Sequence, residues 1–170
     1  RTSPFAFTGN KFEFRAVGSN QSIAGPLTAM NTILCDSLDY IAGKLEGADD
    51  LNAAIQTTLC EIVEKHGRVI FNGDGYSEEW HKEAEARGLP CNRTTADALP
   101  AMISDSVVDL FETFNVMTKD ELHCRYEVAV EQYCAHVNVE ANQVAELGHT
   151  LIYPAAVRYQ SELATAAGSM

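Results

Sequence analysis

The apolar residues of this chain change their spacing at Pro26, and this change limits the possible folds more than any other feature of the sequence. Beyond Pro26 they recur every three or four residues, as they do along one face of an α-helix. Long stretches with this period alternate with short connections, which is typical of an antiparallel helical bundle. We therefore expect a mainly α fold in which residues 25–170 form a helical domain. The stripe of its first helix would contain Leu27, Met30, Leu34, Leu38, Ile41 and Leu45.

Local start and stop signals set the limits of the expected helices. Pro26 suits the first turn of a helix and Gly47 suits its end, while Ser77 is a good N-cap with two glutamates after it. Thr95 would cap a short helical turn, and Pro154 would kink or restart the last helix. The expected helices are about 26–46, 50–66, 77–87, 100–115, 118–137 and 139–167, with an extended run at 68–71, a turn at 72–75 and a break at 88–92. The inward residues of the helix at 100–115 would be Ile103, Val107, Leu110 and Phe114.

The first residues follow a different period. Phe5 and Phe7 alternate with other residues, residues 8–10 have the composition of a turn, and Phe12 and Phe14 alternate again. Alternation with a period of two is typical of strands with one buried face. We therefore expect a short β-hairpin within 4–16, and a first segment, 1–24, separate from the helical domain.

The chain is acidic, with 24 Asp and Glu against 12 Lys and Arg and a formal net charge of −12. This balance argues against broad nucleic-acid binding and against adhesion to an anionic membrane face. Residues 1–20 hold three basic and one acidic side chain, so the remainder carries −14. The acidic body has two interpretations, which are solubility and a subunit or regulatory surface.

The ends of the chain and its cysteines bear on its origin. It begins with Arg1, has no apolar leader, and ends within an apolar helical pattern, so we expect a piece of a longer protein without a membrane span. Five cysteines are an odd number with irregular spacing, which favours free thiols in a reducing, cytoplasmic compartment.

The segment Lys11-Phe-Glu-Phe-Arg15 carries the clearest chemical signal. In a strand, Lys11, Glu13 and Arg15 would share one face at intervals of about 7 Å. Glu13 could then ligate a hard metal ion such as magnesium or manganese, while the two cations hold a carboxylate or phosphate. The alternative interpretation is a solvated strand face with ordinary ion pairs.

Two further patterns favour structural roles. His123 and Cys134 lie eleven residues apart on one expected helix, about 16 Å of rise, which is too far for one metal ion. Tyr76 and Trp80 lie four residues apart and would anchor a short helix to the body.

Several stretches together resemble glutamine synthetases. Residues 1–19 (Arg-Thr-Ser-Pro-Phe-Ala-Phe-Thr-Gly-Asn-Lys-Phe-Glu-Phe-Arg-Ala-Val-Gly-Ser) are similar to the last active-site stretch of that family, which has an Arg-Ser loop followed by an Arg-x-Glu-x-Arg strand. Residues 72–81, 122–127 and 154–160 resemble the type III enzymes specifically. The resemblance covers nearly the whole chain.

The resemblance implies that the full-length enzyme joins ammonia to glutamate with ATP and Mg²⁺ or Mn²⁺, through a glutamyl phosphate that ammonia converts to glutamine. It implies that Glu13 is a metal ligand and that Arg15 contacts the substrate or the transferred phosphoryl group. Arg1 would stabilise the phosphate charge. Lys11 takes the place of an arginine that binds nucleotide phosphate, and keeps its charge without its fork. The second arginine of the family loop has no counterpart, since Ala6 lies near that position.

The resemblance also has consequences for organisation. It implies that the hairpin belongs to the catalytic sheet of the synthetase, that 25–170 is the type-specific helical C-terminal domain, and that the full-length protein is a homo-oligomer, a ring assembly of twelve. Most of the active site would precede Arg1, so we expect residues 1–170 alone to be inactive. Two other hypotheses stay open: a non-catalytic helical assembly or interaction module, and an unrelated helical interaction protein.

Overall fold

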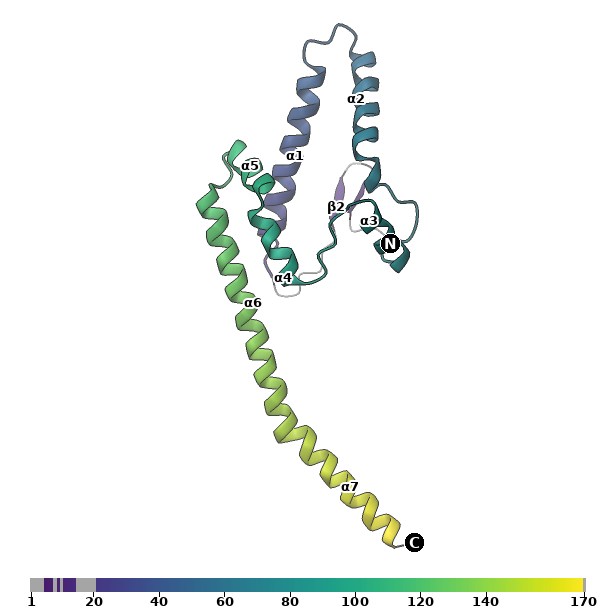
Figure 1. Ribbon diagram of the computed structural model, residues 1–170, viewed down its shortest axis with the longest axis vertical. Helices are drawn as coiled ribbons and strands as arrows, with labels where there is room; N and C mark the ends of the chain where they lie inside the picture. Colours follow the sequence, from purple (N-terminus) through teal and green to yellow (C-terminus); the bar gives the residue numbers. More distant parts are fainter. Residues whose placement is uncertain (1–4, 8, 10, 15–20, 170) are drawn as a thin grey trace. The chain divides into compact units, whose positions relative to one another are not determined.

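The structure is a computed structural model that describes residues 5–7, 9, 11–14 and 21–169. Most of these residues are helical, which confirms the mainly α class (Figure 1). The chain divides into two compact units, Arg1–Lys119 and Asp120–Met170. The first unit contains β1 (Phe5–Phe7), β2 (Phe12–Phe14), α1 (Ala24–Leu45), α2 (Leu51–His66), η1 (Gly67–Val69), α3 (Glu78–Ala86), α4 (Thr95–Ala98), η2 (Leu99–Ile103) and α5 (Asp105–Thr113). The second contains nearly all of α6 (Lys119–Leu147), then η3 (Gly148–Ile152) and α7 (Tyr153–Gly168).

The two strands pair antiparallel. Their register places Phe5 opposite Phe14, Ala6 opposite Glu13 and Phe7 opposite Phe12. Parts of the expected hairpin, including residues 8, 10, 15 and 16, lie outside the described residues, so the hairpin as a whole stays a prediction. The boundary at residue 24 also stays a prediction.

Helices α1 and α2 are joined by a short turn and pack against each other (Figure 1). Gly47 follows α1 with a φ of 74°, a left-handed conformation that glycine adopts at low cost. Asp50 caps α2, since its carboxylate accepts a hydrogen bond from the backbone N–H of Ala53 at 3.0 Å. Further along the pair, Lys44 of α1 donates a hydrogen bond to Glu61 of α2 at 2.8 Å.

The segment after α2 differs in part from expectation. The predicted extended run at 68–71 is wrong at its start, because Gly67–Val69 forms a 3-10 turn and extended dihedral angles are first seen at Ile70. The apolar composition of this run favours a strand, but helical winding continues directly from α2 into the turn. The expected turn at 72–75 lies two residues later, because the Ser77 N–H donates to the carbonyl oxygen of Asp74 at 3.1 Å and so closes a turn over residues 74–77. The N-cap at Ser77 is confirmed, since its hydroxyl accepts from the N–H of Trp80 at 3.2 Å.

The expected helix at 100–115 is also wrong as a single helix. Pro100 lies in a 3-10 turn, and Ser104 adopts extended angles (φ −64°, ψ 148°) before α5 begins at Asp105. The buried residues of α5 are Val108 and Phe111, whereas the four residues expected to point inward are half-buried. The preceding cap is shifted by one residue, since Thr94, not Thr95, caps α4.

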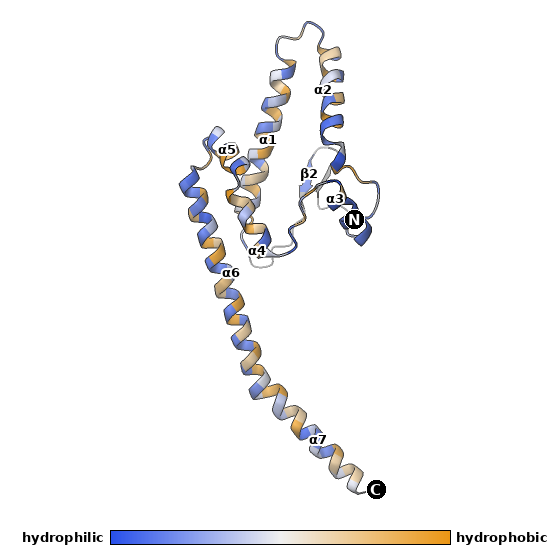
Figure 2. Ribbon diagram, in the orientation of Figure 1, coloured by the Kyte–Doolittle hydropathy of each residue, from blue (hydrophilic) through white to orange (hydrophobic). Residues whose placement is uncertain are grey.

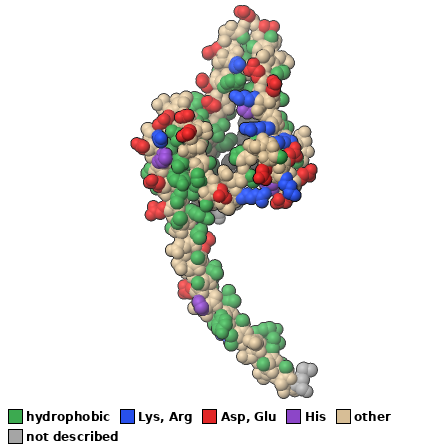
Figure 3. Space-filling view, viewed as in Figure 1, with side chains coloured by type: hydrophobic (Ala, Val, Ile, Leu, Met, Phe, Trp, Pro, Cys, Tyr) green, Lys and Arg blue, Asp and Glu red, His purple; other side chains and the backbone are tan. Residues whose placement is uncertain are grey.

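The described residues bury little apolar surface. Among them, only Ala84, Val108, Phe111 and Leu122 are buried apolar residues. The stripe expected to point inward from α1 is largely open, with Leu38 57% exposed. Figure 2 shows that apolar positions recur along the helices, and Figure 3 shows apolar side chains on the surface of the face in view. The closed antiparallel bundle stays a prediction.

The second unit is a pair of helices joined by a π-helical turn. Helix α6 begins at Lys119, directly after Thr118 as expected, and the Glu112 carboxylate accepts from the N–H of Lys119 at 3.0 Å. The π turn ends just before Pro154, at the start of α7. Because proline lacks an N–H and crowds the preceding turn, a wider turn accommodates it. The expected interruption of the helix at 139–167 is confirmed. The expected division between 118–137 and 139–167 is wrong, because α6 runs through residue 138 without a break to Leu147. Within the described part of the chain, no helix combines the length and apolar character that crossing a bilayer requires.

Candidate functional site

Of the four predicted site residues, Glu13 is the one that the structure places within a strand. It is the central residue of β2, it is partly exposed, and its register partner is Ala6. Because side chains alternate along a strand, the central position of Glu13 in β2 assigns its carboxylate to one face of the ladder. The β-ladder therefore fixes the side on which this carboxylate can meet a ligand.

Of the other three predicted site residues, the structure describes one. Lys11 is exposed and precedes the first residue of β2, so strand alternation does not fix its direction. Arg1 and Arg15 lie outside the described residues, and their roles stay predictions. Ala6 lies near the position where the family loop has its second arginine. In the ladder Ala6 is the register partner of Glu13, the predicted metal ligand.

A complete metal site is not formed by the residues that the structure describes. No group of three or more His, Cys, Asp or Glu side chains gathers among them in a way that could hold an ion. Magnesium usually keeps an octahedral shell of oxygen atoms. Glu13 would be one oxygen donor in such a shell, so these residues do not fit the ion by themselves.

A second cluster joins η1 to α3 through Arg87. Its guanidinium donates to the carbonyl oxygen of Arg68 at 3.1 Å and to that of Ile70 at 2.8 Å, and it pairs with Glu83 one turn earlier in α3. The same group lies 5.4 Å from the centroid of the Trp80 ring. We call this set of contacts the Arg87 clamp. It cross-links two segments that are separated by 17 and 19 residues along the chain.

The aromatic contact beside the Arg87 clamp is also structural. The Phe71 and Trp80 rings stack with centroids 4.4 Å apart and an interplanar angle of 25°. Trp80 thus anchors α3, as expected, whereas Tyr76 is 61% exposed and the expectation for it is wrong. The cluster contains no nucleophile paired with a base. The Phe71–Trp80 contact brackets residues 72–79, most of the segment 72–81 that resembles type III enzymes.

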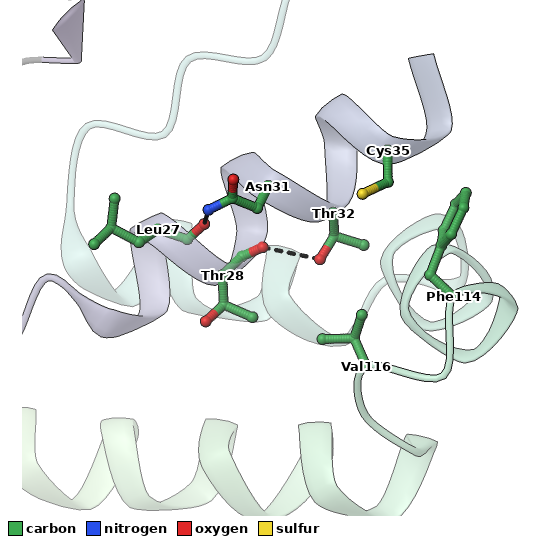
Figure 4. A pocket seen from close by; sticks show the side chains of 7 residues that line it. All are labelled: Leu27, Thr28, Asn31, Thr32, Cys35, Phe114 and Val116. Carbon is green, nitrogen blue, oxygen red and sulfur yellow. Dashed lines mark hydrogen bonds between the residues drawn. The ribbon is translucent and has the colours of Figure 1, made fainter. Parts of the chain in front are cut away.

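A shallow hollow of about 430 Å³ lies between α1 and the end of α5 (Figure 4). Its hydroxyl and amide groups are already used within α1: Asn31 donates to the Leu27 carbonyl, and Thr32 donates to that of Thr28. No charged side chain lines it. The hollow therefore offers apolar contact and no catalytic group, and sequence patterns missed it because its walls come from distant segments. Its lining residues are Leu27, Thr28, Asn31, Thr32, Cys35, Phe114 and Val116.

Charge pairs on the first unit shift the pKa values of two exposed groups. The hydrogen bond and the charge of Glu61 raise the pKa of Lys44, and the same contact with Lys44 lowers the pKa of Glu61. Tyr40 adds to this cluster, with Lys44 and Lys65 at 5.6 and 5.9 Å from its ring centroid. These contacts connect α1 to α2, and they are structural.

Comparison with known proteins gives consistent matches. The family model described as "Glutamine synthetase C-terminal domain" matches residues 54–170. A protein named "Type-3 glutamine synthetase" from Dictyostelium discoideum is 40% identical over 174 residues, which cover 100% of this chain and 24% of that protein.

Two bacterial proteins named "Glutamine synthetase" are similar to the chain as well. The protein from Butyrivibrio fibrisolvens is 37% identical and the one from Bacteroides fragilis (strain YCH46) is 36% identical, and each match covers 96% of this chain and 23% of the relative. The chain therefore spans about a quarter of the length of these curated relatives.

Proposed function

This chain belongs to the glutamine synthetase family, and from that premise we propose that it is part of a type III enzyme that joins ammonia to glutamate with ATP. The observation that carries the proposal is the 40% identity to the Dictyostelium protein over the entire chain. That match includes residues 1–24, which precede the stretch matched by the family model. The likeness thus reaches the segment that contains Glu13.

The proposed reaction has two steps. An oxygen of the glutamate side-chain carboxylate attacks the terminal phosphorus of ATP, which releases ADP and leaves glutamyl phosphate. Ammonia then attacks the acyl carbon, phosphate leaves with the bonding electrons, and the nitrogen loses a proton to give the amide of glutamine. Negative charge moves onto phosphoryl oxygens in both steps, so fixed cations near them lower the barrier.

The residues of this chain would take four roles in that reaction. Arg15 would contact the substrate or the transferred phosphoryl group, Arg1 would stabilise the phosphate charge, and Lys11 would bind nucleotide phosphate. Glu13 would donate one oxygen ligand to Mg²⁺ or Mn²⁺. The remaining ligands would come from other parts of the full-length protein, which is why we propose that residues 1–170 alone are inactive.

The test compares the full-length protein that contains this chain with a Glu13→Gln variant. Glutamine formation is measured from glutamate, ammonium and ATP with magnesium. The variant removes a charge and keeps the side-chain shape, and we expect it to lower kcat/KM by roughly 100-fold, as loss of a ligand or transition-state contact commonly does. The matched control is Glu46→Gln, at an exposed position after α1, which should stay within about twofold.

Three results would count against the proposal. A full-length parent that forms no glutamine would refute the ligase assignment. A Glu13→Gln enzyme with parental activity would refute the role of Glu13. Glutamine formation by residues 1–170 alone would refute the proposal that this piece is inactive.

A second candidate function is a helical assembly or interaction module without chemistry of its own. The exposed apolar residues on the helices favour it, and the family model that matches 54–170 describes a C-terminal domain. This module is compatible with the ligase proposal, in which the full-length protein is a homo-oligomer, a ring assembly of twelve. We also propose a cytoplasmic location, which the five exposed free cysteines favour.

A further inference from the structure

Asn72-Gly73 is the only Asn-Gly pair in the sequence, and it lies between the two rings of the Phe71–Trp80 contact. Asparagine is a thermolabile residue, because the next backbone nitrogen can attack its side-chain amide carbon and close a succinimide ring. Glycine hinders this attack least, since it has no Cβ and adopts more backbone conformations than any other residue. The sequence therefore makes Asn72 the most reactive asparagine of the chain.

The structure leaves both reacting groups of this pair available. Asn72 and Gly73 are exposed and lie outside the helices and strands. Within the described part of the chain, the Asn72 side-chain amide has no hydrogen-bond partner and the Gly73 N–H donates to no acceptor. The adjacent Asp74-Gly75 pair can form the same ring, but the Asp74 carboxylate is held by the N–H of Tyr76 at 2.9 Å. Of the two pairs, Asn72-Gly73 is thus the one without such a restraint.

Packing of the neighbouring aromatic rings requires the glycine of the pair. A Cβ atom at Gly73 would lie 2.7 Å from the Phe71 ring, which is closer than two carbon atoms approach without a shift. The same ring stacks on Trp80 with the centroids 4.4 Å apart. A larger residue at position 73 would therefore displace Phe71 from the tryptophan. The contact that orders this segment depends on the residue that makes Asn72 labile.

We propose that Asn72 is a site of spontaneous deamidation, and that this modification loosens the Phe71–Trp80 contact. The Gly73 nitrogen gives its proton to solvent and attacks Cγ of Asn72, and the side-chain nitrogen takes up a proton and leaves as ammonia. Water then opens the ring. Breaking the bond from Cγ to nitrogen gives aspartate, whereas breaking the bond from the main-chain carbonyl carbon to nitrogen gives isoaspartate. One water is consumed and one ammonia is released, and no oxidant takes part.

The two products change this segment in different ways. Both place a carboxylate at position 72, in a stretch, 72–79, that already has three acidic side chains and no Lys or Arg. Isoaspartate also lengthens the main chain by one atom, a further bond of about 1.5 Å, because the chain then passes through Cβ and Cγ. That atom is inserted between two residues whose rings are in contact. The stack or the turn at 74–77 must adjust to it, whether or not the proposed ligase reaction is correct.

The test follows the folded full-length protein that contains this chain during prolonged incubation at neutral pH, with peptide mapping by mass spectrometry. Asn72 should convert to aspartate and isoaspartate at least roughly tenfold faster than Asn92, which is also exposed and outside the helices but precedes an arginine. Asn31, whose amide donates to the Leu27 carbonyl at 2.8 Å within α1, should stay intact. Asn72→Gln keeps an amide on a longer side chain, and position 72 should then stay unmodified.

A second measurement tests the effect on the aromatic contact. Amide hydrogen exchange in peptides that cover residues 71–80 should be at least about threefold faster in the isoaspartate form than in the fresh protein. Asn72→Asp adds the charge without the extra atom, so its exchange should lie closer to that of the fresh protein. Conversion of Asn72 no faster than that of Asn92, or conversion only after unfolding in urea, would overturn the proposed site. Unchanged exchange in the isoaspartate form would overturn the proposed loosening.

Discussion

The Arg87 clamp gives the sharpest test of how the first unit is held together. Arg87→Ala removes the hydrogen bonds to the carbonyl oxygens of Arg68 and Ile70, the pairing with Glu83 and the contact with the Trp80 ring. A hydrogen bond from a charged donor contributes about 1.5–3 kcal/mol, and the cation–π contact about 0.5 kcal/mol at a partly exposed site. The Arg87 side chain is 28% exposed, so water replaces part of these contacts. We expect the free energy of unfolding to fall by about 2–4 kcal/mol.

The assay is urea unfolding followed by tryptophan fluorescence. Trp80 is the only tryptophan in the chain, so the signal comes from the clamp itself. Arg87→Lys keeps the charge and loses the fork, and it should retain about half of the contribution. The control is Arg93→Ala, whose contact with Glu78 is 3.9 Å long between side chains that are 62% and 76% exposed, and it should cost less than about 0.5 kcal/mol. An Arg87→Ala protein as stable as the Arg93→Ala protein would refute the clamp.

Two further predictions concern neighbouring contacts. A Cβ atom at Gly73 would lie 2.7 Å from the Phe71 ring, so Gly73→Ala should displace that ring from the tryptophan, shift the emission and cost about 1 kcal/mol; unchanged emission would argue against it. The lowered pKa of Glu61 means that its contact with Lys44 stabilises the fold above the unfolded-state pKa, and that this contribution is lost as the pH falls through the folded-state value. Unfolding midpoints between about pH 5 and 3 should therefore depend less on pH in Glu61→Gln than in the parent, and identical pH profiles would contradict this.

Local signals in the sequence predicted much of the helical structure. The Ser77 cap and the interruption at Pro154 depend on residues within one turn, and both appear where the sequence places them. Thr94 and Thr95 offer the same chemistry at adjacent positions, so composition alone cannot choose between them. The break at Ser104 follows from backbone angles that a serine does not require. The sequence pattern therefore missed Val108 and Phe111 as the most buried residues of α5, although the expected residues beside them are half-buried.

The sequence patterns did not predict the long-range contacts. The hydrogen bonds of Arg87 to Arg68 and Ile70 join residues 19 and 17 positions apart, and local patterns do not report contacts over such separations. For the candidate site, the strand position of Glu13 was predictable from alternation with the phenylalanines. The roles proposed for Arg1 and Arg15 rest on resemblance, and both residues lie outside the described part of the chain.

At the π turn, Gly148–Ile152, the number of residues determines how α7 is oriented about its own axis. Such a turn contains about one residue more than the α-helical turn it replaces. Each residue of an α-helix turns the chain by about 100°. Deleting one residue from the π turn would therefore rotate the whole of α7 about its axis by that amount. A change in chain length, without any substitution, would present a different side of the last helix to whatever packs against it.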